Sequence, residues 1–173
     1  LPIYLFVLDD ESGEVLHREG DDVLLLRADD VLRFNREGLL TERRHRNGSV
    51  LAYRYNASQQ LVSITDSSAR SLEVTYGAGS ERNLITGLSV AGNVMVRYGY
   101  TEGLLTTVIY ADGSTRRYHY ENPDFPTHLT GITAEDGERF SWYSYDAKGR
   151  VTCSQHSPGC ADLALGTAGV RLE

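Results

Sequence analysis

The chain has 173 residues, long enough for one domain with a sizeable core, and 17 Gly and 11 Tyr stand against 4 Pro and 1 Met. This composition favours short strands joined by tight turns over long helices. A net charge of −7 and the absence of a long Lys/Arg run argue against a nucleic-acid surface. No segment reaches the ~20 apolar residues of a membrane-spanning helix.

Residues 1–33 are expected to form an irregular β lead-in, in which acidic turns at 9–13 and 20–22 separate apolar stretches such as 23–27. The apolar start, residues 1–8, lacks the initiating Met and the basic segment of a signal peptide. We therefore expect a piece of a longer polypeptide, with any export signal outside it.

Residues 34–152 contain a repeat. An aromatic residue followed by a polar or small one closes a strand-like segment every 20 to 25 residues or so, a spacing typical of stacked or spiralling arrays. The closing pairs are Phe34-Asn35, Tyr55-Asn56, Tyr76-Gly77, Tyr100-Thr101, Tyr120-Glu121 and Tyr145-Asp146.

Tight turns lie between the closing pairs, at Asn47-Gly48, Asp112-Gly113 and Asp136-Gly137, with weaker versions at Ala91-Gly92 and Asp66-Ser67. Asn-Gly and Asp-Gly predict two-residue type I′ hairpins, because both central residues need positive φ. Five such hairpins predict about ten strands. An apolar residue opens each pair, at Leu39, Leu61, Leu84, Leu104 and Leu129, and Val151 stands at the equivalent place after the last pair.

The strands alternate apolar and polar residues in several places, as in Leu72, Val74 and Tyr76 against Ser71 and Glu73. Such alternation predicts a sheet with one apolar face and one polar face. Nothing in the sequence supplies a second layer for the apolar face. The predicted fold is therefore all-β, with consecutive antiparallel hairpins forming a curved or spiralling sheet, part of a larger cocoon-like shell.

Residues 153–173 lose the repeat pattern and are expected to form a non-repeat tail. Cys153, His156 and Cys160 lie close together there. We expect two unpaired cysteines; a disulfide and a share in a zinc site are the alternatives. No metal or other cofactor is predicted.

The repeat units resemble the Rhs/YD-repeat family, whose typical phrase is a Tyr-Asp pair, a Gly-Arg-Leu turn and an Asp-Gly hairpin. Residues 145–151, Tyr-Asp-Ala-Lys-Gly-Arg-Val, match it best, and the units at Tyr55-Asn56 and Tyr76-Gly77 are degenerate. The resemblance covers roughly residues 30–152 and extends to the shells of Tc toxin B/C components and teneurins.

The resemblance implies a non-catalytic wall segment of an Rhs-type toxin, secreted or exported by a bacterium, that encloses a C-terminal toxic domain for delivery. Its expected partners are the rest of the shell polypeptide and the enclosed toxin domain, and the fragment alone is expected to self-associate. The Asp-Pro-x-Gly signature of the family's self-cleaving region is missing, since 124–126 is Asp-Phe-Pro. Self-cleavage is not predicted.

An enzymatic function and a carbohydrate-binding function are the alternatives. Carboxylates sit mostly in turns, and no Gly-x-Ser-x-Gly elbow exists, so no catalytic residue is predicted and the chain is not expected to be an enzyme. Exposed tyrosines also suit a cell-surface carbohydrate-binding or adhesion module. Its ligand-facing aromatics are Tyr98, Tyr118 and Tyr143; the competing interpretation is that these rings only stabilise the sheet. The repeat positions themselves are Tyr55, Tyr76, Tyr100, Tyr120, Tyr145, Gly48, Gly113 and Gly137.

Overall fold

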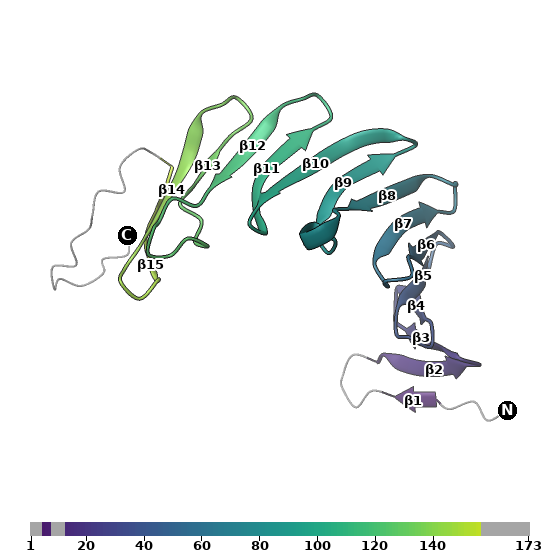
Figure 1. The fold of residues 1–173 in the computed structure, drawn as a ribbon. Helices are drawn as coiled ribbons and strands as arrows, with labels where there is room; N and C mark the ends of the chain where they lie inside the picture. Colours follow the sequence, from purple (N-terminus) through teal and green to yellow (C-terminus); the bar gives the residue numbers. More distant parts are fainter. Residues whose placement is uncertain (1–4, 8–12, 157–173) are drawn as a thin grey trace. The chain divides into compact units, whose positions relative to one another are not determined.

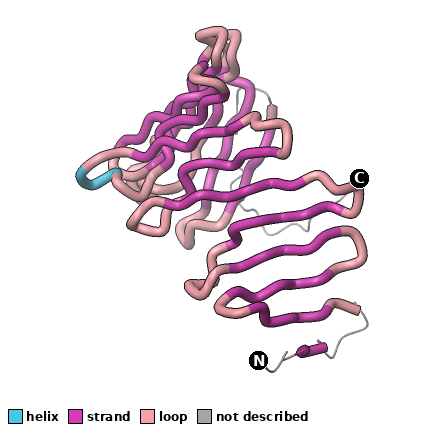
Figure 2. The backbone as a smooth tube through the Cα atoms, turned by 90° about the vertical axis from the view of Figure 1, so that its right-hand side faces the viewer, coloured by secondary structure: helices cyan, strands magenta, loops and turns pink. Residues whose placement is uncertain are grey.

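The structure, a computed structural model, describes residues 5–7 and 13–156. The regular secondary structure of this part is almost entirely β-strand, and its single helical element is a short 3₁₀ turn, η1 (Gly79–Glu81) (Figures 1 and 2). Every pair of strands is antiparallel and joins neighbours in the sequence. The prediction of an all-β fold of consecutive hairpins is confirmed.

The chain divides into two compact units, Leu1–Met95 and Val96–Glu173. The strands of the first unit follow the order of the sequence: β1 (Leu5–Val7), β2 (Val15–Glu19), β3 (Asp22–Leu26), β4 (Asp30–Phe34), β5 (Leu40–His45), β6 (Val50–Tyr55), β7 (Leu61–Asp66), β8 (Ser71–Tyr76) and β9 (Ile85–Val90). Strands β2 to β4 are regular, so no change in the strand pattern marks residue 34.

The second unit has the same plan. Its strands are β10 (Asn93–Thr101), which begins just before it, β11 (Leu104–Tyr110), β12 (Thr115–His119), β13 (Gly131–Thr133), β14 (Arg139–Tyr145) and β15 (Val151–Gln155). Ten strands, β5 to β14, lie wholly within residues 34–152, in agreement with the five predicted hairpins. Strands β4 and β15 cross the two ends of this region.

The type I′ prediction is wrong at the Asn-Gly and Asp-Gly turns. Only the glycine of each pair has positive φ: +85° at Gly48, +85° at Gly113 and +88° at Gly137. Each closes a three-residue loop, and in the first of them Gly48 N–H donates to His45 O at 2.9 Å. Two-residue turns with both φ values positive occur instead at Ala91-Gly92 and Glu102-Gly103.

The sheet buries little. Leu32 and Val108, 9% and 5% exposed, are the only buried hydrophobic residues among those described. One cross-strand row of the first unit runs Leu16, Leu25, Leu32, Arg43 and Leu51. These aliphatic side chains are mostly half-buried, as expected for a sheet face without a second layer.

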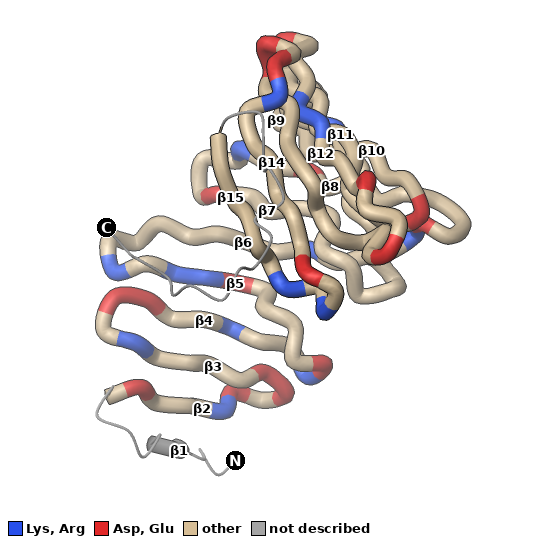
Figure 3. The backbone as a smooth tube through the Cα atoms, turned by 90° about the vertical axis from the view of Figure 1, so that its left-hand side faces the viewer, with Lys and Arg blue, Asp and Glu red and all other residues tan. Residues whose placement is uncertain are grey.

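The basic cluster around residues 43–46 is balanced by acids. Arg43 lies 2.6 Å from Asp30 Oδ2, and Arg44 lies 3.0 Å from Glu42 Oε1. Basic and acidic positions are interspersed along β2 to β5 (Figure 3). No helix in the described part of the chain is long and apolar enough to cross a membrane.

Candidate functional site

Each closing tyrosine, where its bond is seen, joins two strands at the end of the hairpin where their backbone pairing has stopped. The phenol of Tyr55, at the end of β6, donates a hydrogen bond to Leu40 O at the start of β5, over 2.9 Å. The same bond recurs three times, 15 or 16 residues back along the chain. Its other members are Tyr76 to Leu61 O at 3.1 Å, Tyr120 to Leu105 O at 3.0 Å and Tyr145 to Leu129 O at 2.7 Å.

The position of each tyrosine hydrogen bond follows from the length of the ladder, which is the number of residue pairs between the two strands. Strands β5 and β6 pair over only three residues, from Glu42↔Ala52 to Arg44↔Val50, next to the Asn-Gly turn. The pairs β7/β8, β11/β12 and β13/β14 are equally short. The pairs β2/β3, β3/β4, β4/β5, β6/β7, β8/β9, β10/β11 and β14/β15 have four to six. The pairs β1/β2 and β12/β13 have three. We call four of these hairpins forks: β5/β6, β7/β8, β11/β12 and β13/β14. In each fork a tyrosine bridges the end where the strands are not paired.

Burial raises the pKa of the phenols of Tyr55, Tyr120 and Tyr145, with a smaller contribution from a neighbouring tyrosine two residues earlier. These phenols therefore stay protonated and can donate at neutral pH. Tyr100 lies at the corresponding place on β10, opposite Leu105 and directly after a register shift. The repeat tyrosines thus occupy equivalent positions in the fold.

The polar residue after the closing aromatic organises the next turn. Asp146 Oδ1 accepts from the backbone N–H groups of Lys148 and Arg150, at 2.8 and 3.0 Å. Asn35 and Asn56 make the same two bonds in their turns. A side-chain oxygen that caps its own turn lowers the cost of forming it. In the Tyr-Asp motif, the tyrosine bridges the open end of a fork, and the aspartate side chain caps the turn that follows.

Asp146 makes stability depend on pH. Hydrogen bonds from the backbone and the side chain of Arg150 lower the pKa of this carboxyl from 3.8 to about 2. A lowered pKa stabilises the fold above the unfolded value, and that contribution is lost as pH falls from about 4 to about 2. Because Asn caps the equivalent turns, Asp146→Asn should fold but lose less stability over this range. Thermal unfolding at pH 5 and pH 2.5 compares the two; equal losses would contradict the assignment.

Tyr98, Tyr118 and Tyr143 stand opposite Val108, Ile132 and Ser154 on neighbouring strands. All three side chains are half-buried. Their role as ligand-facing aromatics remains a prediction, and packing on cross-strand neighbours is compatible with their position.

The connection between β12 and β13 carries contacts that no sequence motif predicts. Arg139 Nη1 lies 3.0 Å from Glu121 Oε2, and its Nη2 donates to Thr130 O at 2.9 Å. The ring of His128 packs edge-on against Tyr145, with centroids 4.7 Å apart, and tilts over Phe125 at 4.9 Å. Apart from the contact of His128 with Phe125, these contacts join residues that are not close in the chain, so no local pattern predicts them. They fix the longest loop of the second unit.

Cys153 is disulfide-bonded, so the expectation of unpaired cysteines is wrong at this position. The other member of the predicted cluster, Cys160, lies outside the described residues, as do most of the tail residues 153–173. Among the described residues, no group of three or more His, Cys, Asp or Glu side chains has the geometry to hold a metal ion.

Comparison with known proteins finds the same repeat. The RHS Repeat family matches residues 34–71. That segment begins at the first closing aromatic and contains the fork of β5 and β6 with its bridging Tyr55.

The chain is also similar to Double-stranded DNA deaminase toxin A of Burkholderia cenocepacia (strain H111). The two are 29% identical over 98 residues, which are 57% of this chain and 7% of that protein. The matched region is thus a small part of a much longer toxin. Similarity of this extent supports a shared repeat region and carries no enzymatic activity to this chain.

Proposed function

We propose that this chain, whose residues 34–71 match the RHS Repeat family, is a non-catalytic wall segment of an Rhs-type toxin, which encloses a C-terminal toxic domain for delivery. The series of tyrosine-bridged forks is the observation that carries the proposal. It builds an extended sheet from local hairpins, and this sheet buries almost no core of its own. Such a sheet suits the wall of a container better than a self-contained catalytic domain.

The proposed partners are the rest of the shell polypeptide and the enclosed toxic domain. The similarity to a long toxin, of which this region covers 7%, supports a larger natural polypeptide. A bacterial, exported protein is the corresponding proposal for its location.

Enclosure predicts protection from protease. In the natural full-length polypeptide, the C-terminal toxic domain should resist a protease that digests the same domain when it is made alone. Changing Tyr55 and Tyr145 together to Ala should open two forks and speed cleavage of the toxic domain, measured by gel electrophoresis over time. Arg46→Ala, at an exposed turn, is the control and should leave protection intact. Equal cleavage rates for the enclosed and the isolated domain would refute enclosure.

The isolated fragment should self-associate. Among the described strands, β15 pairs only with β14, and its Val151 is 59% exposed. An exposed strand edge beside apolar side chains favours edge-to-edge pairing. Light scattering should show dimers or larger species whose share grows with concentration; a monomer at all concentrations would contradict this.

A further inference from the structure

The turn between β5 and β6 holds the only Asn-Gly pair of the sequence. Asn47 and Gly48 are both exposed there. An asparagine that precedes a glycine is open to a reaction within the chain, in which the backbone nitrogen of the glycine attacks the carbon of the side-chain amide. Glycine favours this attack because it has no side chain to shield its nitrogen.

The turn also activates the amide that would be attacked. Ser49 N–H donates to Asn47 Oδ1 at 3.0 Å, and the hydroxyl of Ser49 donates to the same oxygen at 2.7 Å. Donors placed on a carbonyl oxygen stabilise the negative charge that this oxygen gains when a nucleophile adds to its carbon. Both bonds therefore make Asn47 Cγ more reactive.

The reaction balances without an oxidant or a reductant. The Gly48 nitrogen loses its proton and forms a bond to Asn47 Cγ. The bond from Cγ to Nδ2 breaks, and ammonia leaves with that proton, so a five-membered cyclic imide remains. Water then opens the imide on one of its two sides. Opening at Cγ gives aspartate, and opening at the main-chain carbonyl carbon gives isoaspartate.

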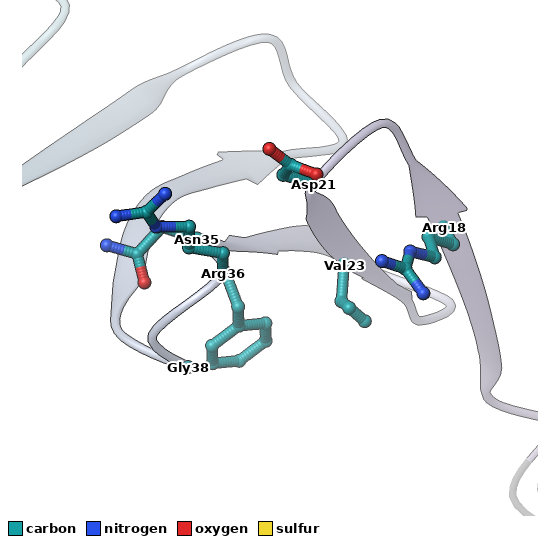
Figure 4. Close-up of a pocket in the computed structure, with 7 residues that line it drawn as sticks. Arg18, Asp21, Val23, Asn35, Arg36 and Gly38 are labelled. Atoms are coloured by element: carbon teal, nitrogen blue, oxygen red, sulfur yellow. The ribbon is translucent and has the colours of Figure 1, made fainter.

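The two other asparagine-capped turns of the first unit lack a glycine after the asparagine. Asn35 precedes Arg36, and both line a hollow of this unit (Figure 4). Asn56 precedes Ala57. The side-chain oxygen of each asparagine accepts from two backbone N–H groups. A Cβ next to the attacking nitrogen hinders its approach, so these two turns are internal controls.

One hydrogen bond opposes the reaction. Gly48 N–H donates to His45 O at 2.9 Å, and the nitrogen must leave this bond before it attacks. The turn can open locally, because β5 and β6 pair over only three residues beside it and exposed turns open more readily than the centre of a sheet. The reaction should therefore be slower in the folded chain than in urea, but it should still proceed.

The aspartate product fits the turn. Asp112-Gly113-Ser114 closes the turn between β11 and β12 with the same contacts, since Ser114 N–H and the Ser114 hydroxyl donate to Asp112 Oδ1 at 2.9 and 2.6 Å. The glycine φ is +85° in both turns. The isoaspartate product instead adds one carbon to the backbone, directly beside a ladder of three residue pairs. It should open the fork of β5 and β6.

We propose that Asn47 is a self-modification site, at which the folded chain converts its own asparagine into aspartate and isoaspartate. The aspartate form keeps the fork and adds one negative charge to the turn. The isoaspartate form loosens the same fork. The proposal does not depend on the enclosure of a toxin.

The test is to incubate the full 173-residue chain in buffer at pH 8 and to follow its peptides by mass spectrometry. The technique detects the gain of one mass unit, and fragmentation separates isoaspartate from aspartate. Asn47 should react at least about tenfold faster than Asn35 and Asn56, which corresponds to a modest difference in barrier. The reaction should also be faster at pH 8 than at pH 6, because the attacking nitrogen must lose its proton.

Two substitutions test the role of the hydroxyl. Ser49→Ala removes one donor to Asn47 Oδ1 and should slow the reaction roughly threefold to tenfold, the kinetic equivalent of one hydrogen bond. Ser49→Thr keeps a hydroxyl and should keep the rate. A rate that is unchanged or raised in Ser49→Ala would overturn activation by Ser49.

The two products are tested separately. Asn47→Asp should unfold at the same urea concentration as the unmodified chain, and a clear loss of stability would overturn the fit of the aspartate product. Incubated chain that contains isoaspartate should exchange the amide hydrogens of residues 42–44 and 50–52 faster than fresh chain; equal exchange would overturn the opening of the fork. Equal rates at Asn47 and Asn35, or modification in urea alone, would overturn the site itself.

Discussion

Tyr55→Ala is expected to destabilise the first unit by about 2–3 kcal/mol. The ring fills the open end of the fork between β5 and β6, and its phenol donates to Leu40 O. Truncating a fully buried aromatic costs roughly 3–5 kcal/mol, and Tyr55 is only half-buried. Urea unfolding of the full chain, followed by circular dichroism, measures the change in midpoint.

Tyr55→Phe separates the ring from its hydroxyl. It keeps the ring in the fork and removes one hydrogen bond, so it should cost about 0.5–1.5 kcal/mol. If the Phe variant lost as much stability as the Ala variant, the hydrogen bond alone would hold the fork, and the ring would have no share in it.

Gly77→Ala should cost about 3 kcal/mol, a large effect for one added methyl group. A Cβ at this position would lie 2.7 Å from Glu81 Cβ and 2.8 Å from Glu81 O. The loop cannot retreat easily, because Gly77 N–H donates to Leu84 O and Leu84 N–H donates to Glu81 O. Overpacking against backbone forces shifts of this energetic size.

Gly79→Ala is the matched control two residues away. Gly79 has φ of +60°, and a Cβ there meets nothing within 4 Å. The control therefore carries only the left-handed backbone penalty, about 1–2 kcal/mol. Thermal unfolding compares the stability of the two variants. If the Gly79 variant were as unstable as the Gly77 variant, backbone conformation and not the close approach of Glu81 would account for the loss of stability.

Local patterns were enough to predict the β-strands and most turns. Alternation around Leu72, Val74 and Tyr76 placed β8, and Asp112-Gly113 placed the turn after β11. The turn type was wrong because an Asp-Gly pair suits two geometries. In one, both residues have positive φ. In the other, found here, the aspartate side chain caps the residue after the glycine, as Asp112 does for Ser114 N–H at 2.9 Å.

Contacts across strands could not be predicted in the same way. The bond from Tyr55 to Leu40 O depends on the ladder between β5 and β6 ending early, and no residue type signals where a ladder ends. The recurrence of the tyrosine was visible in the sequence; its partner was not.

The alternation of short and long ladders makes the sheet divisible. Separating β5 from β6 breaks three residue pairs and the bond of one tyrosine, whereas separating β6 from β7 breaks five pairs. An asparagine side chain caps the turn of each of these two hairpins. Forks are therefore the joints at which a sheet of this kind can gain or lose two strands with least disturbance to its neighbours. A gene encoding such a protein can change the size of its product by duplicating or deleting one fork-to-fork segment.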